Sequence, residues 1–209
     1  ASKVLGAYGK AISEDLQAKF WSNATSATKT AVAAGSNTTA EKAYVAGLTA
    51  GQFDGVITRM IYNNGAVGGR INVVGTTISS SNIATEYAKV YAAIPAKVLF
   101  GSVKPYIYAP YSHKQFINIY NVSATYRDLF SVQNDVYFYN GVEIKFVPLA
   151  ENIVIAARPD YIIWCTDLLS DINLLKIDKI AANREDMFVK NIMTIFAHVV
   201  NQSMNVLYC

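Results

Sequence analysis

The stretch RPDYIIWCTDLLSD, residues 158–171, carries side chains that could do acid-base chemistry. Asp167 and Asp171 are four residues apart, which on a helix would place two carboxylates on one face, as a general acid and base require. Within this stretch, however, Asp167 follows an apolar β-like run. It is well placed there to turn the chain out of a sheet, and Asp171 is well placed to end the next turn. The structural interpretation is therefore favoured over a catalytic one.

A thiol nucleophile at Cys165 would need one of the two histidines, His113 or His198, as its base. No family signature surrounds Cys165, so a buried, inert thiol is the expectation. His198 lies in an apolar strand pattern and is expected to be a hydrogen-bonded sheet residue. His113 falls at a predicted helix start, where a surface position suffices.

The glycine-rich segments GAVGG and AGLTAG match no phosphate loop, because neither is followed by Lys and Ser or Thr. Both are interpreted as turns. His, Cys, Asp and Glu show no metal-ligand spacing, and the two cysteines cannot build a disulfide framework. We expect no catalytic residue, no metal and no cofactor.

Asn-x-Ser/Thr triplets begin at Asn23, Asn37, Asn121 and Asn201, as they would in a secreted glycoprotein. The 14 tyrosines are compatible with a carbohydrate- or base-stacking surface. They are equally compatible with sheet and subunit interfaces, where an apolar ring with a polar tip is useful.

The composition is that of a globular protein: 52% of the 209 residues are hydrophobic and only 16% are charged. A net charge of +3 without a Lys/Arg run gives no positive case for a dedicated nucleic-acid binder. The apolar runs are too short to span a bilayer, and the amino end lacks a signal-peptide pattern, so we expect a soluble chain with no membrane partner. Low charge suits subunits that bury much surface against neighbours.

Helical patterns dominate the first 130 residues. Apolar spacing predicts a helix over Ser2–Trp21, a loop over 22–39, and a helical stretch from an N-cap at Thr39 to Ile61. A short strand and a helix near Ile83–Ile94, stopped by Pro95, come next. An extended run at Val103–Ala109 precedes a helix that Ser112 can cap and that continues toward Tyr126.

Strand patterns dominate the rest. Asn140-Gly141 between DVYFY and VEIKFV predicts a β-hairpin. Further strands are expected at Ile153–Ala157, Tyr161–Cys165, Leu174–Ile180, Met187–Val200 and Met204–Tyr208. Helices first and strands later indicate the α+β class rather than a βαβ series.

The chain resembles the tailed-phage major capsid proteins of the Hong Kong 97 fold in the order of its features. These are the helix near Ile83–Ile94, the runs at Lys104–Pro110 and Ser112–Tyr120, the strand pair Tyr139–Pro148, the passage DYIIWCTDLLSD and the closing MFVKN stretch. Upstream, AKFWSNATSATKTAVAAG and FDGVITRMI look like the end of the family's spine helix, a variable loop and the segment after it. The chain looks like the part that follows the family's amino-terminal arm and extended loop.

The resemblance implies three regions: residues 1–82 as spine helix and part of a peripheral domain, 83–165 as an axial-like domain, and 166–209 as strands completing the peripheral domain. It implies a non-enzymatic virion subunit, made in a bacterial host's cytoplasm, whose copies form pentamers and hexamers of an icosahedral shell. Scaffold or portal proteins would be further partners, and packaged DNA would be contacted without sequence specificity.

Three alternatives stay open. An encapsulin-type nanocompartment protein would share the fold and hold cargo enzymes instead of DNA. A secreted tyrosine-rich binding module would carry glycans at the four triplets. An enzyme would use the Cys165 thiol.

Overall fold

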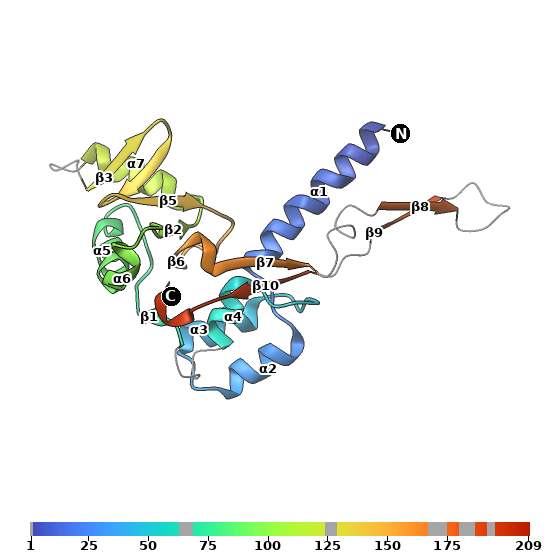
Figure 1. Ribbon diagram of the computed structural model, residues 1–209, viewed down its shortest axis with the longest axis horizontal. Helices are drawn as coiled ribbons and strands as arrows, with labels where there is room; N and C mark the ends of the chain where they lie inside the picture. Colours follow the sequence, from blue (N-terminus) through green and yellow to red (C-terminus); the bar gives the residue numbers. More distant parts are fainter. Residues whose placement is uncertain (1, 63–68, 124–128, 167–174, 180–186, 192–194) are drawn as a thin grey trace.

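The computed structural model describes residues 2–62, 69–123, 129–166, 175–179, 187–191 and 195–209 (Figure 1). The chain is a mixed α+β protein, as expected from the sequence. Its helices are α1 (Ser2–Trp21), α2 (Ser26–Ala34), α3 (Thr39–Gly47), α4 (Val56–Tyr62), α5 (Ile83–Ala93), α6 (Ala96–Leu99) and α7 (Ser112–Ser123).

A seven-stranded mixed sheet in the order β1-β11-β6-β2-β5-β4-β3 forms the centre of the body. Its strands are β1 (Ile71–Val73), β2 (Tyr106–Ala109), β3 (Phe130–Gln133), β4 (Val136–Tyr139), β5 (Val142–Phe146), β6 (Val154–Ala157) and β11 (Val206–Tyr208). The pairs β1–β11 and β2–β5 are parallel, and the other pairs are antiparallel.

Both faces of the central strands are buried, because successive side chains of a strand point to opposite sides. On β6, Val154 and Ala156 belong to the core that contains α5 and α7, whereas Ile155 and Ala157 belong to the core that contains α2, α3 and α4. On β11, Leu207 points to the second core and its two neighbours to the first. The sheet therefore lies between two layers of helices and contributes side chains to a core on each face.

Two further strand pairs leave the body. β7 (Ile162–Thr166) pairs antiparallel with β10 (Ile195–Val199), and β8 (Leu175–Lys179) pairs antiparallel with β9 (Met187–Asn191). The second pair lies beyond the outer end of the first, and α1 points away from the body on the same side (Figure 1). We call β7 and β10 together the ribbon.

Segment 22–39, expected to be a loop, contains helix α2. Its cap is Thr25, whose Oγ1 accepts a hydrogen bond from the backbone N–H of Thr28 at 3.3 Å. The Thr28 hydroxyl then donates to Asp54 at 2.8 Å, and Val32 is fully buried. Capping and packing hold a helix here whose small residues give no clear apolar stripe.

The helical stretch expected from Thr39 to Ile61 is two helices, α3 and α4. The N-cap is one residue earlier than expected, at Thr38, in a capping box with Glu41. The non-helical segment between them packs against the chain after α1, because the N–H groups of Gly51 and Gly55 donate to the carbonyls at positions 24 and 23, both at 2.8 Å.

Several local expectations are confirmed. The hairpin at Asn140-Gly141 has positive φ at both residues, 46° and 78°, as a type I′ turn requires. Helix α5 ends just before Pro95, and α7 begins at Ser112. A strand lies within each run expected after Pro148, but the single run expected at Met187–Val200 contains two strands, β9 and β10, that belong to different pairs. The end of the α7 pattern toward Tyr126 lies outside the described residues.

A polar network ties the carboxyl-terminal strand to the rest of the body. The Tyr208 hydroxyl donates to the carboxylate of Glu86 on α5 at 2.7 Å and accepts from the Thr76 backbone N–H at 3.0 Å. Lys89 Nζ lies 2.8 Å from the same carboxylate. The bonds from Tyr208, Thr76 and Lys89 outweigh the effect of burial and lower the pKa of Glu86, so this carboxylate is ionised at neutral pH.

The three regions expected at 1–82, 83–165 and 166–209 meet in this sheet. β2 to β6 come from the middle region, β1 from the first and β11 from the last. The axial-like and peripheral division stays a prediction, and in this fold it describes regions that share one sheet.

Candidate assembly surfaces

The ribbon brings Cys165 and His198 to the same face. Directly opposed residues of an antiparallel pair point to one side, and the pairs are Cys165 with Phe196 and His198 with Ile163. The thiol and the imidazole are thus diagonal neighbours, but among the described residues no hydrogen bond joins them. Cys165 is half-buried, not fully buried as expected, because its face of the ribbon is not covered by the body.

His113 is fully buried, which corrects the expected surface position. Its Nε2 lies 2.8 Å from the Glu151 carbonyl oxygen and its Nδ1 lies 3.0 Å from the Tyr87 hydroxyl. Since a carbonyl only accepts, Nε2 carries the proton and Nδ1 accepts from Tyr87. Burial lowers the pKa of His113 to about 4, so it is a neutral link between α5, α7 and the loop before β6, not a base exposed to a substrate.

Asp167 and Asp171 lie outside the described residues. Within the ranges that the structure describes, no group of three or more His, Cys, Asp or Glu side chains is arranged to hold a metal ion. None of the helices in those ranges is both long and apolar enough to cross a membrane.

The tyrosines of the middle third mostly build the core. Tyr87, Tyr137 and Tyr139 are buried, and the Tyr87 ring contacts those of Phe130 and Tyr139 with centroids 5.5 Å and 5.8 Å apart. They fill the space between the sheet and α5, as the interface interpretation of these residues expects.

Of the four Asn-x-Ser/Thr triplets, the one at Asn23 is the least accessible to a glycan. It is only 4% exposed, and its side-chain amide lies where a Cβ on Gly51 would be. A glycan has no room there in the folded protein. Asn37 and Asn121 are half-buried and Asn201 is exposed.

Helix α1 is poorly covered along the part whose side chains the structure describes. Between Gly9 and Lys19 every residue is exposed except Ile12 and Leu16, which are partly exposed. Two ion pairs within the helix, Lys10 with Glu14 and Asp15 with Lys19, lie on its surface at 3.8 Å and 2.7 Å. Such exposed pairs contribute about 0.3 to 0.5 kcal/mol each, too little to hold an isolated helix.

The base of α1 is fixed by aromatic contacts. Among the described side chains of the helix, only Phe20 and Trp21 join a hydrophobic core. Phe20 contacts Trp164 of β7 at a centroid distance of 4.9 Å, and Trp21 contacts Tyr108 of β2 at 5.1 Å. The helix is therefore anchored at one end, and its remaining length stands away from the body (Figure 1).

The ribbon has one covered face and one open face. Ile162, Ala197 and Val199 pack into the second core, whereas Trp164 on the same side contacts Phe20 and stays 38% exposed. The open face, formed by Ile163, Cys165, Phe196 and His198, leaves Ile163 40% and Phe196 42% exposed. An exposed apolar face gains free energy when another surface covers it.

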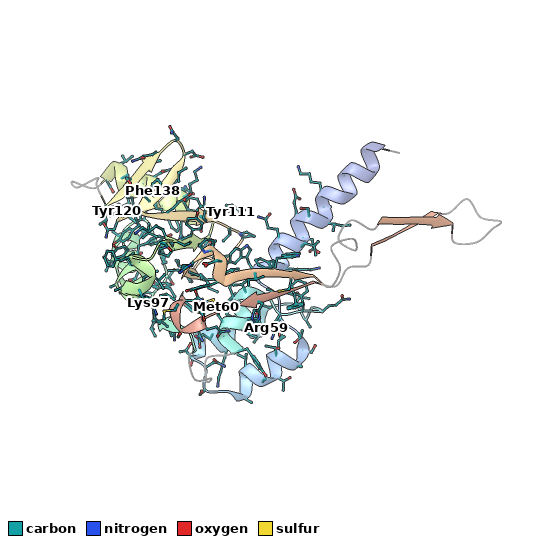
Figure 2. All side chains as sticks on the ribbon, in the orientation of Figure 1. Arg59, Met60, Lys97, Tyr111, Tyr120 and Phe138 are labelled. Carbon is teal, nitrogen blue, oxygen red and sulfur yellow. The ribbon has the colours of Figure 1, made fainter. Side chains whose placement is uncertain are left out.

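A third group of exposed apolar side chains lies at the far end of the molecule from the ribbon, on α7 and β3 (Figure 1). Val122 is 80% exposed, and Ile119 and Val132 are more than two-fifths exposed. Figure 2 shows this end of the sheet with Tyr120 and Phe138 labelled beside it. The molecule thus has apolar surface at both ends.

These surfaces were only partly predictable. The helical spacing of α1 identified its apolar positions. Such a stripe normally packs against the core of its own chain, so the spacing alone could not predict that it is exposed. Which face of the ribbon is open depends on the register of its two strands and on the contact between Trp164 and α1. Neither of these can be read from a single sequence.

No protein-family profile matches the chain, and no curated protein matches its sequence.

Proposed function

We propose that the protein is a shell-forming subunit, with the Hong Kong 97 type of fold, whose copies assemble as pentamers and hexamers of an icosahedral phage capsid. The observation that carries the proposal is the exposed length of α1, a helix attached to the body by Phe20 and Trp21. A helix of 20 residues is about 30 Å long, which reaches well beyond the body of its own subunit.

A free amphipathic helix in water is poorly stable, since most helical stability in proteins comes from packing of an apolar face. Ile12 and Leu16 are one turn apart on one side of α1 and lie only partly covered. The spacing of Val4, Leu5 and Tyr8 continues this stripe toward the amino end in the sequence. A second copy of the chain would supply the surface that this stripe lacks.

The open face of the ribbon supports the same proposal. A flat apolar face on a two-stranded ribbon is marginal in water without a partner. Closed shells need subunits with several distinct apolar contact surfaces, because each copy must touch more than one neighbour. The ends of this molecule provide such surfaces on α1, on the ribbon and on the α7–β3 end.

The order of the elements is further support. A long first helix, a middle region of helices and strands, and closing strands occur in the order that the resemblance to tailed-phage capsid proteins implies. In this proposal the protein has a structural role and no catalytic one. Contact with packaged DNA would be modest and independent of sequence at a net charge of +3.

The test is the solution mass of the chain at rising concentration, measured by light scattering, with negative-stain images of the same samples. We expect pentamers, hexamers or closed shells at high concentration. Phe196→Ser, which removes apolar area from the open face of the ribbon, should move assembly to higher concentration. Phe100→Ser is the matched control, because it removes an exposed phenylalanine ring, 77% exposed, that lies outside these three surfaces. A strictly monomeric wild-type chain at the highest soluble concentration contradicts the proposal.

A further inference from the structure

A pocket of about 450 Å³ lies where α6, the turn before β7 and the turn before β11 meet. These turns are short 3-10 helices, η2 (Pro159–Tyr161) and η4 (Gln202–Met204). The polar side chains of its lining are those of Lys97, Ser102, Arg158, Tyr161, Asn201 and Ser203. Lys97 is labelled in Figure 2 at the edge of the body.

The lining carries two cationic side chains, Lys97 and Arg158, and neither Asp nor Glu, while the Asp160 carboxylate just outside the lining pairs with Arg158. Another cavity, of about 610 Å³, is different, because its lining contains Glu151 and no Lys or Arg. Positive charge with hydroxyl and amide donors around a concave site is the arrangement that binds phosphate oxygens.

Arg158 is held in place before any ligand arrives. Its Nε and Nη2 donate to the two carboxylate oxygens of Asp160 at 3.0 Å and 2.6 Å, and its guanidinium lies over the Tyr161 ring at 4.8 Å. Nη1 is the guanidinium nitrogen outside this bidentate pair, and it is the one through which a bound anion would be held. A fixed guanidinium loses little conformational entropy when it binds an anion.

Lys97 on α6 supplies the second cationic side chain of the lining. Within the described residues its ammonium group makes no ion pair, and the hydroxyls of Ser102 and Ser203 make no hydrogen bond to protein. An ammonium and a guanidinium in the lining of one pocket can both donate to the oxygens of a phosphate group.

We propose that this pocket binds a phosphate group, either free or esterified. The volume exceeds that of the bare ion and is sufficient for a phosphate with a sugar attached. The proposal does not rest on self-assembly, because every residue of the pocket belongs to one copy of the chain.

The first experiment is calorimetric titration of the full chain with inorganic phosphate at constant ionic strength. We expect saturable binding, weakened about tenfold by Lys97→Gln and about tenfold by Arg158→Gln, as expected for loss of one charge-assisted contact. Lys114→Gln on α7, which also removes one positive charge but lies outside the pocket, should bind as the wild-type chain does. Circular dichroism of each variant verifies that it is folded.

The result that overturns the proposal is a wild-type chain without saturable phosphate binding, or binding that the two pocket variants and Lys114→Gln affect equally. A second titration, with a short DNA duplex at several salt concentrations, distinguishes the source of the phosphate. If each pocket variant lowers the slope of log K against log salt by about one, the site takes nucleic-acid phosphates. If phosphate binding falls and DNA binding is unchanged, it takes free phosphate or a small phosphate ester.

Discussion

Burial of His113 makes the stability of the protein depend on pH. Its pKa is about 4 in the folded protein, against an ordinary value of 6.5. As the pH falls from 6.5 toward 4, the unfolded chain binds a proton at this position that the folded chain does not bind. The free energy of unfolding therefore decreases across this window.

Between pH 7 and pH 5 we expect the wild-type protein to lose about 2 kcal/mol through His113. In His113→Gln the loss should be much smaller, whatever the variant's stability at pH 7, because the group that titrates is gone. His198→Gln is the matched control, since it removes the other histidine and leaves the buried His113 in place, so the loss through His113 should persist. Urea unfolding at the two pH values measures the difference, and equal losses in all three proteins would contradict the assignment.

Gly75 is required because no Cβ fits at its position. A Cβ there would lie 1.9 Å from Cζ of the Tyr208 ring, whose hydroxyl is held by Thr76 and Glu86. We expect Gly75→Ala to destabilise the protein by about 2 to 3 kcal/mol, since the ring must leave its hydrogen bonds or the strand must move. Thermal unfolding measures the change.

Gly9→Ala is the control for that substitution. Gly9 lies inside α1 with nothing within 4 Å of its Cβ position, so alanine should stabilise the helix by about 0.5 to 1 kcal/mol. Two Gly→Ala changes of opposite sign would separate the steric conflict at Gly75 from the general effect of adding a methyl group.

At the scale of elements, the sequence predicts those held together by local signals. The Asn140-Gly141 turn, the stop at Pro95 and the start at Ser112 depend on backbone preferences of one or two residues, and all three are confirmed. Helix α2 was not predicted, because its stability comes from Thr28 bonding to Asp54, 26 residues further along the chain. Distant partners of this kind leave no periodic pattern in the sequence.

The burial of His113 was missed for the same reason. Its two partners, Tyr87 and Glu151, lie 26 and 38 positions away. A histidine at a helix start is compatible with either surface or core, and only the tertiary contacts decide. Likewise, the contrast between the covered and open faces of the ribbon depends on the position of α1 next to Trp164.

Helix α1 leads to a prediction at this scale. Leu16→Gln should raise the concentration at which the chain assembles by about tenfold or more, because it removes roughly 2 kcal/mol of apolar burial from each contact that uses the stripe. The stability of the monomer should change by less than about 0.5 kcal/mol, as for other surface positions. Light scattering and urea unfolding measure the two effects.

Ser13→Gln on the exposed side of the same helix is the control, and its assembly should match the wild type. If Leu16→Gln unfolds the monomer, or assembles at the same concentration as Ser13→Gln, the stripe on α1 is not an intersubunit surface.

For the whole molecule, the central sheet makes the three regions interdependent. Residues 83–165 contribute β2 to β6, but β6 pairs with β11 on its outer side, and β11 pairs with β1. Ile155 and Ala157 on the second face of β6 are covered by residues from outside 83–165, among them Leu207. Because the two cores share the central sheet, we expect the protein to unfold as one cooperative unit.

A fragment of residues 83–165 should consequently fail to fold when expressed alone. It lacks the strand that covers one side of β6 and the helices that cover one face of the sheet. Dispersion of amide signals in an NMR spectrum is the measurement. A well-dispersed spectrum of the fragment would show that the first core alone is sufficient.

The contacts at the base of α1 have an optical consequence. The chain has two tryptophans, Trp21 and Trp164, and both rings lie beside Phe20, with centroid distances of 5.4 Å and 4.9 Å. All of the tryptophan emission therefore originates at the point where the projecting helix meets the ribbon. A change in the angle of that joint would alter the wavelength and lifetime of the intrinsic fluorescence, so the protein reports its own rearrangement without an added dye.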